Sequence, residues 1–150
     1  MLLPCEGEGR NAVDTSKQGK VKAEKLSKMN AVSINYELRD AMMADYPENS
    51  FDAIAFVYAH FPVHSRKKIH QKAVKWLKPG GILILEAFAP DQLENHSGGP
   101  KDPTMLYTEA ILKEDFEGLT INVLNTLEIN LNEGEYHKGI ANVVRLVGTK

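Results

Sequence analysis

The fold of this chain is decided by an apolar stretch that follows a proline and two glycines. It reads Leu77-Lys78-Pro79-Gly80-Gly81-Ile82-Leu83-Ile84-Leu85-Glu86-Ala87-Phe88. Proline and glycine end a preceding helix, because proline lacks a backbone donor and glycine readily leaves the helical conformation. The apolar run from residue 82 to residue 88 is typical of a strand buried on both faces, as in a parallel sheet.

A second apolar run precedes this one and predicts a neighbouring strand. Residues 51–59 are almost continuously apolar, after a turn at residues 47–50. Residues 62–77 between the two runs have a helical pattern, with basic residues on one side and apolar residues on the other. Strand, helix and strand in this order indicate a parallel pair joined by a crossover helix.

The remaining segments extend this pattern at both ends. Residues 16–29 predict a helix that Thr15 or Ser16 caps, with a rough apolar stripe of Val21, Leu26 and Met29. The alternation in residues 32–38 predicts a strand. The last third of the chain predicts a short helix over 108–115, which Thr108 can cap, and a hairpin of strands 119–131 and 139–148, joined by residues 132–138.

Together these elements predict one α/β domain over residues 1–150, a mostly parallel sheet with helices on both faces and a C-terminal antiparallel hairpin. Ligands of such sheets lie beyond the carboxyl ends of the parallel strands. Segments 5–11, 39–43, 58–62 and the chain from 88 onward are expected at this edge, together with the hairpin turn 132–138. The long polar loop 89–107 is expected to act as a lid.

Composition narrows the functional classes. The chain has 150 residues, 18 basic and 20 acidic side chains and a net charge of −2, so neither a nucleic-acid nor a membrane partner is expected. Cys5 is the single cysteine, which excludes an internal disulfide and favours a reducing, cytoplasmic environment. His60, His64 and His70 lack the further ligands of a zinc site, so no metal is expected.

Three short motifs carry the chemistry. Residues 7–12 match G-x-G-x-x-A, in which glycine lets the backbone approach a ligand closely; an ordinary strand-to-helix turn has the same pattern. Asp14 is expected at a strand tip, where it can accept hydrogen bonds from ribose hydroxyls or cap the helix that follows. Asp40 ends the next strand and can receive an adenine amino group, or be a solvated turn acid.

The order of these motifs, with Pro47 to Ile54 and Leu77 to Gly81, resembles class I S-adenosylmethionine-dependent methyltransferases. Segments 3–12, 98–103 and 133–139 resemble the branch related to the tellurite-resistance methyltransferases. The resemblance implies S-adenosyl-L-methionine as cofactor. It implies cofactor contacts from Glu6, Gly7, Glu8, Gly9, Arg10, Asn11, Asp14, Thr15, Asp40, Ala41, Tyr58, Ala59 and His60. Candidate substrate-side residues are His60, Tyr107, Tyr136 and His137.

The chain departs from the pattern of this family between Gly9 and Asp14. Two parallel strands need a crossover of roughly a dozen or more residues, and four residues stand here. The first crossover helix, most of the second strand and the usual N-terminal helix are therefore expected to be absent, which leaves an apolar face uncovered. Residues missing from the sequence, a truly shortened chain, or a second chain that fills the gap would each explain this.

Methyl transfer from a sulfonium is an in-line displacement that works through proximity and orientation, so no catalytic triad is expected. The first hypothesis is methyl transfer to a small-molecule acceptor by a monomer or homodimer. A nicotinamide-dependent oxidoreductase is an alternative, although Asp14 is much nearer to the glycines than the usual spacing of about 20 residues. A degenerate, non-catalytic methyltransferase-like binding module is the third possibility.

Overall fold

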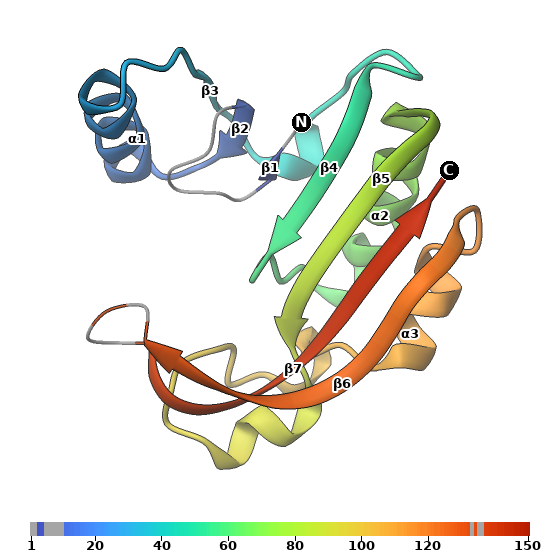
Figure 1. Cartoon of the computed structure of the whole chain (residues 1–150). Helices are drawn as coiled ribbons and strands as arrows, with labels where there is room; N and C mark the ends of the chain where they lie inside the picture. Colours follow the sequence, from blue (N-terminus) through green and yellow to red (C-terminus); the bar gives the residue numbers. More distant parts are fainter. Residues whose placement is uncertain (1–2, 5–10, 133, 135–136) are drawn as a thin grey trace.

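A computed structural model describes residues 3–4, 11–132, 134 and 137–150. The short strands β1 (Leu3–Pro4), β2 (Asn11–Asp14) and β3 (Asn35–Leu38) pair in parallel. A second sheet has the order β4-β5-β7-β6, with bounds Phe51–Val57, Leu77–Phe88, Lys138–Thr149 and Thr120–Asn132. Strand β1 contacts β4, so the two sheets lie edge to edge (Figure 1). Strands β4 and β5 are parallel and β7 is antiparallel to both of its neighbours, which confirms the predicted sheet and hairpin.

The predicted helices are present. They are α1 (Lys17–Met29), α2 (Val63–Trp76) and α3 (Glu109–Asp115), with short 3₁₀ turns η1 (Ala41–Met43), η2 (Pro90–Glu94) and η3 (Pro103–Met105). Ser16 caps α1 by accepting a hydrogen bond from the Gly19 amide at 2.8 Å, and Thr108 caps α3 through the Ile111 amide at 3.2 Å. These are the cap positions that the sequence predicts.

The predicted apolar stripe of α1 is wrong. Val21 and Met29 are 66% and 72% exposed, and α1 instead packs through Gly19 and Ala23. A Cβ atom added to Gly19 would lie 2.8 Å from the Tyr36 hydroxyl oxygen, so the missing side chain lets α1 approach β3 closely. Strand β3 is also shorter than the alternation predicts, since it begins at Asn35.

Six residues connect β1 to β2, about half of what a parallel connection normally needs. Because Pro4 pairs with Val13, the chain has to return along the strand direction by only two residues, about 7 Å, to reach Asn11. Six residues can span at most about 20 Å, and the short strands therefore make the connection possible. After this connection, Asn11 and Ala12 are consecutive residues of β2, and they pair with Asn35 and Tyr36 of β3.

The two faces of the larger sheet differ in how they are covered. Helices α2 and α3 lie behind it in Figure 1, and this face carries the main core around Phe56 and Leu83. In the smaller sheet, Val13 of β2 joins this core, whereas its neighbour Ala12 packs with α1. Helix α1 therefore covers the smaller sheet on the side opposite to α2 and α3. On that side β4 and β5 remain open: Val57 and Ile84 are 39% and 43% exposed. Helices thus lie on both faces, and the expected uncovered apolar face is present.

A buried polar cluster joins α2 to α3. Asp115 accepts hydrogen bonds from Arg66 Nε at 2.6 Å and from His70 Nδ1 at 2.8 Å. Burial lowers the pKa of the His70 imidazole, although its hydrogen bond to Asp115 opposes the shift. Burial alone would raise the pKa of Asp115, but the bonds from His70 and Arg66 bring it below its usual value. The cluster is therefore a carboxylate held by an arginine and a neutral histidine.

Acid is expected to destabilise this cluster. Because the folded state binds a proton at His70 more weakly than the unfolded chain does, stability is present at neutral pH and is lost as pH falls below about 6.5. The depressed pKa of Asp115 acts in the same direction at lower pH. Urea unfolding at pH 7.5 and 5.5 should show the loss, and His70→Gln should reduce it. His64→Gln, at an exposed histidine, should not; equal slopes for both variants would contradict the assignment.

Candidate functional site

Two acids stand at the carboxyl ends of neighbouring strands. Asp14 is the last residue of β2, and its carbonyl accepts the Arg39 amide at 2.9 Å, so Asp40 follows directly beside it. Oδ1 of Asp14 accepts the Ser16 amide at 3.0 Å, and Oδ1 of Asp40 accepts the Met42 amide at 2.9 Å. Asp40 thus caps η1, whereas Asp14 binds the amide of Ser16, the residue that caps α1. A carboxylate has about four acceptor sites, so each group keeps capacity for a ligand hydroxyl or amino group.

Tyr58 forms an unusual turn directly after β4. Its φ of 50° lies in the left-handed region, which non-glycine residues rarely adopt. Its ring stacks on Phe88 with centroids 4.8 Å apart, and its hydroxyl donates to Glu86 Oε1 at 2.7 Å. Such backbone outliers concentrate at functional sites. Ala59, the next residue, is buried.

His60 uses both ring nitrogens within the protein. Nδ1 lies 2.7 Å from the Met105 carbonyl oxygen, and Nε2 lies 3.2 Å from the Phe88 amide nitrogen. A carbonyl only accepts and an amide only donates, so these partners require the neutral Nδ1–H tautomer. Burial lowers the pKa of His60, which is consistent with a neutral ring. His60 therefore has no ring nitrogen free for a ligand, and its ring also lies against Phe88 and Tyr107.

The remaining candidates fall in different places. Tyr107 has no exposed surface, and its hydroxyl donates to the Ala59 carbonyl and accepts the Phe61 amide, so it belongs to the core and has no surface for a substrate. His137 is exposed beside the hairpin turn, Thr15 is exposed and Ala41 is buried. Asn11 begins β2 instead of ending the glycine turn. The other candidates lie outside the described residues: they are Glu6, Gly7, Glu8, Gly9, Arg10 and Tyr136. Cys5 also lies outside them.

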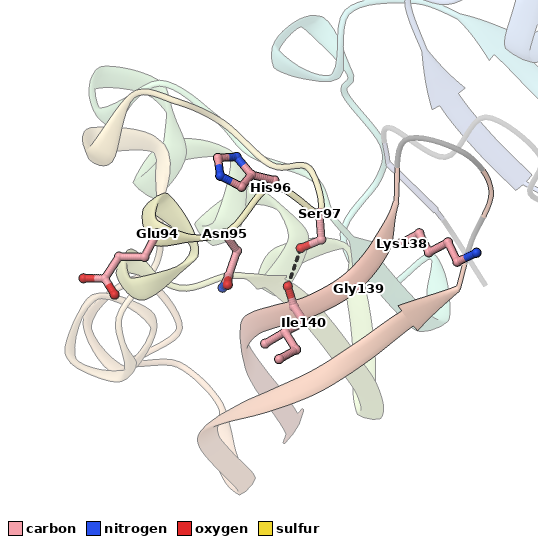
Figure 2. Close-up of a pocket in the computed structure, with 7 residues that line it drawn as sticks. All are labelled: Glu94, Asn95, His96, Ser97, Lys138, Gly139 and Ile140. Carbon is pink, nitrogen blue, oxygen red and sulfur yellow. Dashed lines mark hydrogen bonds between the residues drawn. The ribbon is translucent and has the colours of Figure 1, made fainter.

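A pocket of about 280 Å³ lies between the loop after β5 and the start of β7 (Figure 2). It is lined by Glu94, Asn95, His96, Ser97, Lys138, Gly139 and Ile140. Its wall is held by Ser97, whose hydroxyl donates to the Ile140 carbonyl at 2.6 Å. Buried Gln92 ties the same loop together, because it donates to Ser97 and accepts the Asn142 amide. This part of loop 89–107 is anchored to β7 and is not the free lid that its length predicts.

Glu86, Arg145 and Gln92 are polar residues that sequence reasoning missed. Arg145 Nε donates to Glu86 Oε2 at 2.5 Å, across the pairing of β5 with β7. Glu86 and Arg145 each interrupt an otherwise apolar strand, and a charge at such a position is the feature of the sequence that could have identified them. Within the described ranges, no three potential ligands lie close enough to hold a metal ion. In the same part of the chain, no helix is long and apolar enough to cross a membrane.

Comparison with known proteins identifies the family. Residues 7–85 match the methyltransferase domain family. The chain is similar to phosphoethanolamine N-methyltransferase of Plasmodium falciparum, at 36% identity over 64 residues, covering 41% of this chain and 24% of that protein. It is also similar to the ubiquinone/menaquinone biosynthesis C-methyltransferase UbiE of Pseudoalteromonas translucida, at 27% identity over 129 residues, covering 85% and 45%. The chain thus spans less than half the length of either relative.

Solved structures agree on the fold. TehB from Haemophilus influenzae superposes with a TM-score of 0.76 at 14% identity, over 99% of this chain and 57% of that one. A SAM-dependent methyltransferase from Methanosarcina mazei gives 0.70 at 16% identity, over 99% and 91%. The family match covers more than half of the chain and includes Asp14, Asp40 and the turn at Tyr58. The chain therefore belongs to the methyltransferase domain family and has the class I methyltransferase fold.

Proposed function

We propose that this protein transfers a methyl group from S-adenosyl-L-methionine to a small-molecule acceptor. The observation that carries the proposal is the family match over residues 7–85, which spans Asp14, Asp40 and Tyr58. In an open α/β sheet, ligands bind beyond the carboxyl ends of the strands, where these three residues lie.

The described residues fit such a cofactor. Asp14 would accept hydrogen bonds from the ribose hydroxyls, with Thr15 beside it, and Asp40 with Ala41 would contact the adenine. Tyr58, Ala59 and His60 would lie near the sulfonium. The family resemblance also implies contacts to the methionine part from Asn11 and from five residues outside the described ranges, Glu6, Gly7, Glu8, Gly9 and Arg10. When bound, the cofactor supplies a methyl group on a cationic sulfur, and the protein contributes orientation and exclusion of water.

The acceptor is proposed only as a small molecule. His137 and Tyr136 belong to the hairpin turn and are candidates for contact with it. Phosphoethanolamine is named for the Plasmodium relative and a quinone pathway for UbiE, and the two names point to different acceptors. The family match does not support the nicotinamide alternative, which rests on the G-x-G-x-x-A motif alone. A non-catalytic binding module differs from the proposal only in turnover.

Calorimetry and a turnover assay test the proposal. The intact chain is expected to bind both S-adenosylmethionine and its demethylated product, S-adenosylhomocysteine, and to leave NADH fluorescence unchanged. If the chain bound neither of the two compounds, the proposed function would be contradicted. Binding without methyl transfer to any of a panel of small amines, thiols and quinols would favour the non-catalytic module.

Asp14→Asn is expected to weaken binding of S-adenosylhomocysteine about tenfold or more, because a neutral amide replaces two charge-assisted hydrogen bonds. The amide oxygen can still accept the Ser16 amide, so the thermal midpoint should change little. Calorimetric titration measures the affinity. Asp45→Asn, at an exposed acid in the loop after η1, is the control and should bind as the wild type does. Equal affinities for the two variants would remove Asp14 from the site.

A further inference from the structure

The side chains of Arg145, Glu86 and Tyr58 form a line of hydrogen bonds on the open face of the sheet. The line ends at the carboxyl end of β4, the edge of the sheet called the rim below. The Tyr58 hydroxyl donates to Glu86 Oε1 at 2.7 Å, and Arg145 Nε donates to Glu86 Oε2 at 2.5 Å. The register places Glu86 opposite Val57 on β4 and opposite Arg145 on β7. The line is therefore built into the pairing of three adjacent strands.

Glu86 holds Tyr58 at two points. Its carbonyl accepts the Tyr58 amide at 2.8 Å, and its carboxylate accepts the Tyr58 hydroxyl. A non-glycine residue rarely adopts the left-handed region, and it persists there only where the surroundings enforce it. Stacking on Phe88, at an interplanar angle of 25°, adds a third restraint on the ring. The fold thus commits several interactions to the position of this one ring.

We propose that Glu86, held by Arg145, is a positioning residue that fixes the Tyr58 ring against the bound methyl donor. The inference rests on the proposed function, because it requires a cofactor at the end of β4. Arg145 occupies one carboxylate oxygen, so the other faces the Tyr58 hydroxyl in a single orientation. Because the side chain of Glu86 is partly buried and that of Arg145 is 44% exposed, the pair contributes more to geometry than to stability.

The test measures affinity for S-adenosylhomocysteine in Tyr58→Phe, Glu86→Ala and the double variant. Each single variant is expected to bind about tenfold more weakly, the effect of one charge-assisted hydrogen bond. The double variant should bind no more weakly than either single variant, because Glu86 acts through Tyr58. Glu86→Gln should recover most of the affinity, since its amide oxygen can still accept the Tyr58 hydroxyl.

A matched control separates positioning from stability. Asp52 and Lys78 form a 2.7 Å ion pair on the same two strands, at the end away from the rim. Asp52→Asn should leave affinity unchanged. The inference is overturned if the Tyr58 and Glu86 variants bind as the wild type does, if their effects add, or if they lower only the unfolding midpoint. If the wild type itself does not bind, the proposed function fails first and the inference falls with it.

Discussion

Replacing Asp115 with alanine is expected to lower the free energy of unfolding by about 3–5 kcal/mol. Asp115 is 1% exposed and lies between Arg66 and His70. Its removal leaves the Arg66 guanidinium buried without its counter-ion and the His70 Nδ1–H without its acceptor. His70 Nε2 is already buried without a hydrogen-bond partner among the described residues, so this ring would lose its only such partner there. Urea denaturation followed by Trp76 fluorescence measures the loss.

The adjacent acid provides the control for this variant. Glu114 also pairs with a basic residue of α2, since its Oε1 lies 2.8 Å from Lys67 Nζ, but both side chains are exposed. Exposed ion pairs contribute about 0–1 kcal/mol, so Glu114→Ala should change stability little. If both variants lost the same stability, the buried cluster would have no special role.

A pair of neighbours on β4 tests the unequal faces of the sheet. Phe56 has no exposed surface and contacts Phe61, His70 and Phe116, so Phe56→Ala is expected to cost about 3–5 kcal/mol. Val57 points to the open face and is 39% exposed, so Val57→Ala should cost less than about 1 kcal/mol. Denaturant unfolding at one pH compares the two. A loss at position 57 that equals the loss at position 56 would show that this face is covered in solution.

The elements were predictable because their signals are local. Caps such as Ser16 and Thr108 act within one helical turn, and apolar runs such as residues 51–57 identify strands. The prediction that these strands are buried on both faces was wrong, because one face of β4 and β5 leaves Val57 and Ile84 exposed. The face on which α1 packs was not predictable. Contact there depends on the absence of a side chain at Gly19 over Tyr36, and hydrophobic periodicity takes no account of such a fit.

The placement of Asp14, Asp40 and Tyr58 at or just after the end of a strand was predictable, whereas their contacts with a cofactor stay a prediction. It was not predictable where a role depends on register or on a distant partner. Glu86 and Arg145 meet only because β5 and β7 align at that step. His60 was predicted to contact the cofactor or the substrate, but its ring nitrogens bind the Met105 carbonyl and the Phe88 amide, groups far away in sequence. Spacing along the chain contains no information about such pairs.

The small apolar cluster beneath α1 has a consequence for the dynamics of the molecule. Ala12, Ala23 and Tyr36 are its buried members, whereas the cluster around Phe56 unites residues from α2 and α3 and from three strands of the larger sheet. Local opening therefore requires less free energy around β2 and β3 than around β5. Asp14 and Asp40 belong to this less stable part, so a ligand that binds both would favour its closed form. For this protein, binding the cofactor and completing the fold would be coupled equilibria.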